Sequence, residues 1–241
     1  MPGGIISYSQ PTSRDVQRSA AEISWSTSGW ALPDDAGTTT TGDSKNGSKT
    51  TISYSDLSYL WRFSPGDGMG FGESISFIYG GLIAGSRVAL SASVSVSCEK
   101  TVTVISWTTT KDDDDNEITT TSDPQETTTI VDIGTASNSV IVYTKPNSWS
   151  WSSVDRGSII QETLYASEWN DLIEQCRKYR QWEQQSSVFI NVPTVQSGDL
   201  ITAELYNSMA AACGINTRVT GGRAGTVISA SLFISLANAV S

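Results

Sequence analysis

The stretch VALSASVSVSC, residues 88–98, alternates apolar and serine side chains without a break. Successive side chains of a strand point to opposite sides, so this period of two is typical of a β-strand with one buried face. The apolar members are Val88, Leu90, Ala92, Val94, Val96 and Cys98. The stretch predicts that this section of the chain is β.

The residues that follow this strand extend the β pattern. Glu99 and Lys100 predict a turn into TVTVISWTTT, and strand-like runs recur farther along the chain. We expect those further strands around residues 117–121, 128–133 and 139–144. The sequence therefore predicts a β domain over residues 85–146, either a meander or a small sandwich.

A run of four carboxylates, Asp112–Asp115, interrupts this β section within KDDDDNE. An EF-hand calcium loop places its ligands at alternate positions with a Gly at the sixth and a Glu at the twelfth, and the run meets neither spacing. We interpret the run as a solvated hairpin tip between two Thr-rich strands. Cation binding by the aspartates remains the alternative.

The N-terminal part lacks a clear period. Residues 1–33 include Trp25 and Trp30 among short alternations, which is typical of an arm or an edge strand. Residues 34–49, DDAGTTTTGDSKNGSK, contain no large apolar side chain, so we expect a polar loop or linker there. Residues 50–84 form the next segment.

The C-terminal region, residues 147–241, carries one short pattern three times. It reads ASEWNDLIEQC at 166–176, GDLITAELYNSMAAAC at 198–213 and GTVISASLFISLANAV at 225–240. Aligning the first alanine of each helix pattern superimposes three sets of residues at spacings of three and then four positions, which places them on one helical face. The sets are Trp169, Tyr206 and Phe233; Leu172, Met209 and Leu236; and Cys176, Cys213 and Val240.

Helices of about 10–12 residues are marginal alone in water, so packing among the copies or on a partner must stabilise them. We therefore predict short repeated helices in this region, which makes the protein mainly β and α+β overall. Trp169, Tyr206 and Phe233 are candidate interaction residues because their apolar face must be covered.

Two further tryptophans, Trp149 and Trp151 in NSWSWSS, are expected on the same side of an extended segment. Such a pair could stack on a sugar ring or on an aromatic partner, or it could pack in a core or an interface. We count both residues among the candidate interaction residues.

The composition excludes several classes of function. The chain of 241 residues has a net charge of −10, with no basic stripe to bind a phosphate backbone, so we expect no nucleic-acid partner. No apolar run is long enough to span a bilayer, so we expect no membrane contact. The absence of His removes the usual general base and the commonest metal ligand. We expect no enzyme activity, no cofactor and no metal, since nothing in the sequence singles out a carboxylate pair for glycoside hydrolysis.

The cysteines are three in number and lack a CxxC spacing. Cys176 and Cys213 occupy equivalent positions where the third copy has Val240, so we interpret the cysteines as small buried hydrophobic residues rather than as a disulfide. Equivalent positions on different helices predict similar surroundings and no mutual contact.

Three phrases carry a resemblance to a known class of proteins. ISYSDLSYLW at 52–61 and SISFIYGG at 74–81 resemble the paired "ISxSD" and "ISLSxYYRGG" phrases of tailed-bacteriophage virion proteins. GDLITAELYN at 198–207 is similar to the "GDxITAxxWN" units of phage tail, fibre and head-appendage proteins. The resemblance covers about a third of the chain, and Phe77 and Ile78 depart from the second phrase. The resemblance implies a virion structural protein, but it does not indicate whether that protein belongs to the tail, a fibre or a head appendage.

We therefore expect a non-enzymatic virion component that mediates assembly or attachment. Its expected location is the virion, assembled in the bacterial cytoplasm, and its expected partners are other virion proteins and further copies of itself, with a trimer favoured. The alternatives are a carbohydrate-binding module at a fibre tip, with a host surface glycan as partner, and a depolymerase.

Overall fold

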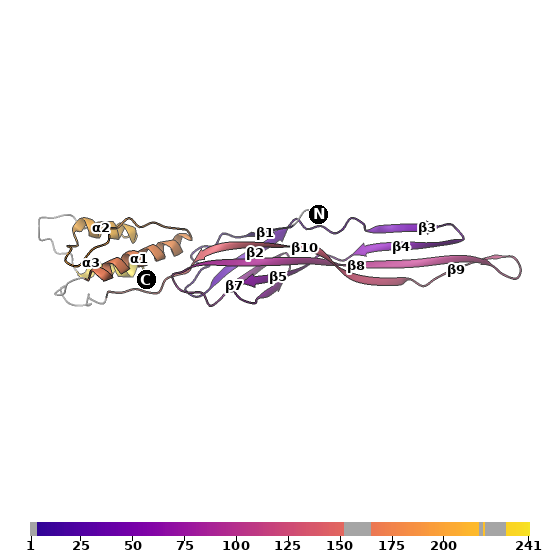
Figure 1. Ribbon diagram of the computed structural model, residues 1–241, viewed down its shortest axis with the longest axis horizontal. Coiled ribbons are helices and arrows are strands. Elements are labelled where there is room, and N and C mark those ends of the chain that lie inside the picture. The colour runs from indigo at the N-terminus through magenta and orange to yellow at the C-terminus, as the bar shows by residue number, and fades with distance from the viewer. Residues whose placement is uncertain (1–3, 152–164, 217–218, 220–229) are drawn as a thin grey trace. The chain divides into compact units, whose positions relative to one another are not determined.

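The computed structural model describes residues 4–151, 165–216, 219 and 230–241 (Figure 1). The protein is mainly β, as predicted, and its described helices follow the strands in the chain. The strands are β1 (Ile5–Tyr8), β2 (Ala21–Ser28), β3 (Gly37–Gly42), β4 (Asn46–Tyr54), β5 (Ser58–Ser64), β6 (Met69–Phe71), β7 (Ser74–Tyr79), β8 (Arg87–Lys111), β9 (Glu117–Thr121) and β10 (Gln125–Tyr143). The helices are α1 (Ala166–Gln184), α2 (Ala203–Ala212) and α3 (Ala230–Ala239).

The chain divides into two compact units, each assembled from separate stretches. Two long strands, β8 and β10, each begin in one unit and end in the other. Unit 1 comprises Met1–Tyr8, Ser24–Ser76 and Ser91–Ser139, and unit 2 comprises Ser9–Ile23, Phe77–Leu90 and Val140–Ser241.

The strands form two sheets. One sheet has the order β1–β2–β7, and its central strand β2 buries alternate side chains from Ala21 to Thr27. The other sheet contains the remaining seven strands, and β8 connects most of them, since it pairs antiparallel with β4, β5 and β9 and also pairs with β10. Strands from residues 85–146 thus share one sheet with strands that precede them in the chain.

The turn expected at Glu99 and Lys100 is wrong, because β8 runs through both residues without a break. Neighbouring residues supply partners at this point: the Glu99 N–H donates to Ser55 Oγ at 2.9 Å, and Lys100 pairs with Tyr54 in the strand register. Lys100 Nζ also lies 2.8 Å from Asp35 Oδ2. Glu99 and Lys100 therefore continue β8, because the Glu99 backbone and the Lys100 side chain both have bonding partners beside the strand.

The polar loop expected over residues 34–49 is also wrong, because most of it forms the β3–β4 hairpin. The Asp43 carboxylate accepts the backbone N–H groups of Lys45 and Asn46, both at 2.8 Å, and so holds the turn. Threonine has a high strand propensity without being apolar. A lack of large apolar side chains therefore did not indicate a lack of strands.

The strands predicted for the later part of the β section are confirmed in part. The strand expected at 117–121 is confirmed as β9, and it forms a hairpin with β8. The two strands expected around 128–133 and 139–144 are instead one continuous strand, β10. Gly134 lies within β10 at a φ of 147°, so the glycine between the two apolar runs does not end the strand.

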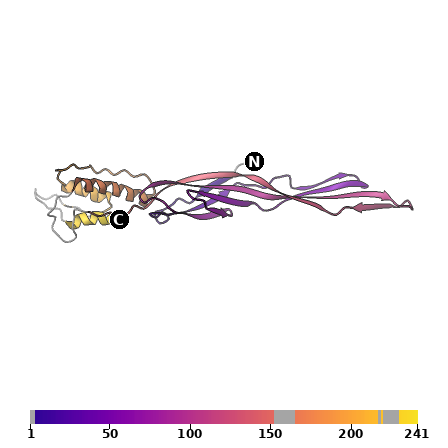
Figure 2. The same cartoon turned by 60° about the horizontal axis from the view of Figure 1, so that its bottom comes forward.

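The buried face of β8 ends before the strand does. Its even-numbered side chains from Leu90 to Cys98 are buried, whereas no residue from Glu99 to Lys111 is. We define the arm as β3, β4, β9 and residues 100–111 of β8 (Figure 2). No described residue of the arm is buried. The arm is therefore one sheet layer without a core of its own, a form that rarely persists alone in water.

Candidate functional site

The three helices begin at the three alanines that the alignment superimposes, Ala166, Ala203 and Ala230. Thr202 caps α2, because its hydroxyl accepts the Leu205 N–H at 3.1 Å. At the same position before α1, Tyr165 makes no side-chain capping bond, and α1 continues for 19 residues. The aligned alanines thus predict where each helix starts, but they do not predict how long it is.

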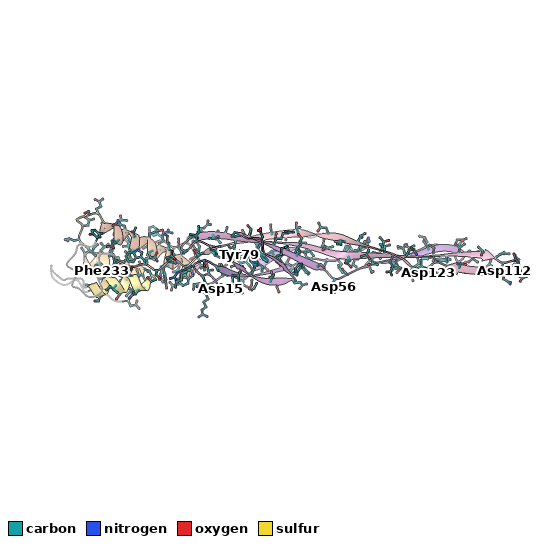
Figure 3. The ribbon with its side chains drawn as sticks, turned by 90° about the horizontal axis from the view of Figure 1, so that it is seen from below. Asp15, Asp56, Tyr79, Asp112, Asp123 and Phe233 are labelled. Carbon is teal, nitrogen blue, oxygen red and sulfur yellow. The ribbon has the colours of Figure 1, made fainter. Side chains whose placement is uncertain are left out.

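The aligned residues lie together inside the helical part of unit 2. Phe233 lies in the helical part of the chain (Figure 3), where its ring meets Tyr206 edge to face with the ring centroids 5.9 Å apart. Trp169 is fully buried in the same cluster. The Tyr206 hydroxyl donates to the Leu232 carbonyl at 3.1 Å. Trp169, Tyr206 and Phe233 are therefore buried together in one cluster of this chain.

The rings of Trp149 and Trp151 do not form a flat surface on which a sugar ring could stack. Their rings meet edge to face, with centroids 4.7 Å apart and an interplanar angle of 77°. Trp151 is buried, and its indole N–H donates to the Phe233 carbonyl at 2.7 Å. Trp149 is partly buried, and its backbone is tied to the Ser241 hydroxyl at 3.0 and 3.2 Å. Trp151 belongs to the core, and only Trp149 retains an exposed ring surface.

A hollow of about 330 Å³ lies beside these two tryptophans. Its lining includes the polar residues Ser150, Asn238 and Ser241 together with Trp149 and Trp151. Its volume is at the small end of the usual range for ligand pockets, about 300–1,000 Å³. The hollow could hold one small polar ring against Trp149.

A second hollow, of about 430 Å³, lies at the start of α1. Trp169 and the loop around Asp199 contribute to its lining, and the buried Trp169 Nε1 has no hydrogen-bond partner in the part of the chain that the structure describes. An unpaired buried donor costs about 1–3 kcal/mol. Sequence patterns contain no signal for such an orphaned group, because it depends on what the fold places around the indole.

The cysteines are all free and buried, which confirms their interpretation as small buried residues. The expectation of no mutual contact is wrong, because the Cys176 and Cys213 thiols lie close enough for each to shift the pKa of the other. The Cys176 thiol, together with burial, raises the pKa of the Cys213 thiol far above its usual range. Both thiols lie in the shared core of the helices, so equivalent positions on neighbouring helices meet there.

The acidic run forms the tip of the β8–β9 hairpin, as expected (Figure 3). Asp112 Oδ1 accepts the backbone N–H groups of Asn116 at 2.8 Å and Asp114 at 3.0 Å, and these bonds lower the pKa of the Asp112 carboxyl. Asp115 pairs with Lys111 at 2.7 Å. These two carboxylates hold the turn, and no group of three metal-ligating side chains occurs among the described residues.

A buried glutamine that sequence reasoning missed joins the end of α1 to β10. Gln185 Oε1 accepts the Tyr143 N–H at 3.0 Å, and its Nε2 donates to the Tyr143 carbonyl at 2.9 Å. The side-chain amide thus replaces the neighbouring strand that Tyr143 would otherwise need. Gln185 lies between other polar residues in the sequence, so nothing local distinguishes it.

The chain matches no protein-family model, no curated protein and no solved structure. Among the helices that the structure describes, none is long and apolar enough to cross a membrane.

Proposed function

We propose that the protein is a non-enzymatic structural component of a bacteriophage virion that mediates assembly or attachment. A tail, fibre or head-appendage position suits it, with assembly in the host cytoplasm. The observation that carries this proposal is the arm, a single sheet layer in which no described residue is buried. A sheet of this kind requires other protein surfaces to cover it, as a component of a particle would have.

The length and chemistry of the strands also support a structural role. Residues 91–111 of β8 extend for about 70 Å at about 3.3 Å per residue. Threonine rows bridge the strands, as in the Thr109–Thr119 hydroxyl contact of 2.8 Å. Such ladders stiffen a sheet without adding charge or reactive groups. The resemblance of ISYSDLSYLW, SISFIYGG and GDLITAELYN to phrases of phage virion proteins supports a virion as the setting of this structural role.

The three helices support the repeat interpretation as part of this proposal. Each starts at the aligned alanine and contributes its aromatic residue and its aliphatic residue to one core. We infer that α1, α2 and α3 are copies of one unit. Their shared burial stabilises α2 and α3, which at 10 residues each are too short to persist alone. The compact helical part would then serve as an attachment module in the particle.

The proposed partners are other virion proteins and further copies of this chain, with a trimer favoured. Assembly that stabilises the folded state makes the melting temperature rise with protein concentration. Analytical ultracentrifugation at micromolar concentration should give about three times the chain mass of 25.8 kDa. A single species of the chain mass, melting at a temperature independent of concentration, would remove the oligomer from the proposal.

The alternative function is glycan binding at the hollow beside Trp149. This alternative is favoured by the hollow itself, whose lining combines tryptophans with polar residues. A glycan array should then show selective binding that Trp149→Ala abolishes and that a change at exposed Phe189, far along the chain, leaves intact. Absence of selective binding by the unaltered protein would reject the alternative, and shortening of a capsule polysaccharide would instead favour a depolymerase.

A further inference from the structure

The two faces of the arm differ in charge, and the strand register defines them. Residues directly opposite each other in an antiparallel pair lie on the same face. Ile52 pairs with Val102, and Ile118 pairs with Thr110. Both pairs involve even-numbered residues of β8, so Ile52, Val102, Val104 and Ile118 share one face.

From Val102 to Thr110 of β8 this face carries no charged side chain, and none occurs at the β3, β4 and β9 positions in register with these residues. Its other members are Ser, Thr, Asn and Gly. The opposite face carries Lys49, which pairs with Ile105, and Lys111, which pairs with Glu117. We call the first side the uncharged face and the second side the charged face.

The uncharged face continues the buried face of the same strand. Val94, Val96 and Cys98 are also even-numbered residues of β8, and all three are buried in unit 1. Beyond Cys98 the same row contains Lys100, which is ion-paired with Asp35, and then Val102 and Val104, which are only partly covered. On the neighbouring strand β9, Ile118 is 49% exposed. A face patterned for burial thus extends past the point where this chain supplies cover.

We propose that the uncharged face of the arm packs against the same face of further copies of this chain. The inference rests on the proposed function, in which the protein is a homo-oligomer, and it names the surface through which the copies associate. Two properties of the face favour an identical copy over a different partner.

The first property is charge. The chain has a net charge of −10, so identical copies repel each other over most surfaces. The uncharged face brings no like charges together, whereas the charged face would oppose Lys49 to another Lys49 in a symmetric contact. The acidic tip residues Asp112–Asp115 lie beyond the last pair of the uncharged face.

The second property is the chemistry of its polar groups. A Ser or Thr hydroxyl is both a donor and an acceptor, so a face lined by hydroxyls satisfies an identical face. Acidic or basic partners would gain no complementary charge from this side of the arm. Apolar contact between Val102, Val104, Ile52 and Ile118 of neighbouring copies then excludes water from the centre of the contact.

Lysine substitutions on the two faces test this surface in the full-length chain. Val104→Lys and Ile118→Lys place a charge on the uncharged face of two different strands. Thr103→Lys and Thr119→Lys place the same charge on the charged face at adjacent positions. Sedimentation at a series of concentrations measures the assembly of all five proteins, and far-UV circular dichroism with tryptophan emission checks that each variant retains the fold.

We expect Val104→Lys and Ile118→Lys to weaken assembly at least about tenfold, because a symmetric contact would bring like charges together in a water-excluded layer. Thr103→Lys and Thr119→Lys should assemble as the unaltered protein does. Assembly that all four variants retain, or that all four lose equally, would overturn this surface while leaving the oligomer in place. A monomeric unaltered protein would overturn both the surface and the oligomer of the proposed function.

Discussion

Phe233→Ala is expected to lower the free energy of unfolding of the helical part by about 3–5 kcal/mol, the usual cost of deleting a buried phenylalanine ring. Only 4% of the surface of Phe233 is exposed to solvent. Its ring packs edge to face on Tyr206 and on Trp151, with the Trp151 centroid 5.5 Å away. The substitution leaves a cavity at the point where α2 and α3 meet the extended segment before α1, so the surrounding residues cannot collapse without moving a helix.

The measurement is denaturant unfolding followed by circular dichroism at a helical wavelength. Phe189→Ala provides a matched control, because Phe189 lies in the same unit and is 86% exposed. We expect that control to change the free energy of unfolding by no more than about 0.5 kcal/mol. An equally small change for Phe233→Ala would mean that the aligned aromatic positions do not form a cooperative core.

Gln185→Ala is expected to destabilise unit 2 by about 2–4 kcal/mol, because it leaves the buried N–H and carbonyl of Tyr143 without partners at about 1–3 kcal/mol each. The backbone of Gln185 has a φ of 47°, which Gln and Ala tolerate to a similar degree, so the change isolates the side-chain amide. The lost bonds are those of 3.0 and 2.9 Å to Tyr143 and the 2.9 Å bond to the Trp182 carbonyl.

The neighbouring Gln184 offers the control for this second substitution. Gln184 is exposed and makes the last turn of α1, so Gln184→Ala removes the same number of atoms without uncovering a buried group. Thermal unfolding of both variants separates the two effects. Equal melting temperatures for Gln184→Ala and Gln185→Ala would show that water replaces the amide at no cost.

Local sequence patterns correctly predicted a strand, the helix starts and a hairpin tip, because each of these depends mainly on residues that are close together in the chain. The alternation from Val88 to Cys98 indicated a strand with one buried face, and those even-numbered residues are buried. The helix starts followed from the aligned alanines, since a cap such as Thr202 acts within one turn. The hairpin tip at Asp112 followed from a run of charges that no core could accept.

Errors arose where contacts distant in sequence outweighed a local signal. Glu99 and Lys100 were expected to turn the chain, but Ser55, Tyr54 and Asp35 provide them with partners in the sheet. The β3–β4 hairpin was missed because apolar content was used as the sign of a strand. This hairpin is held by threonine pairs between β3 and β4 and by the pairing of β4 with β8. The pairing with β8 joins residues far apart in the chain, so the local sequence does not indicate it.

By itself, the sequence determined a mainly β chain and the starting residues of the helices that the structure describes, because period and capping are properties of consecutive residues. Only the tertiary structure decided which surfaces are covered. It placed Trp169, Tyr206 and Phe233 inside one core, brought the Cys176 and Cys213 thiols together, and left the arm without cover. Burial depends on what the rest of the chain brings to a surface, and no residue's neighbours in sequence contain that information.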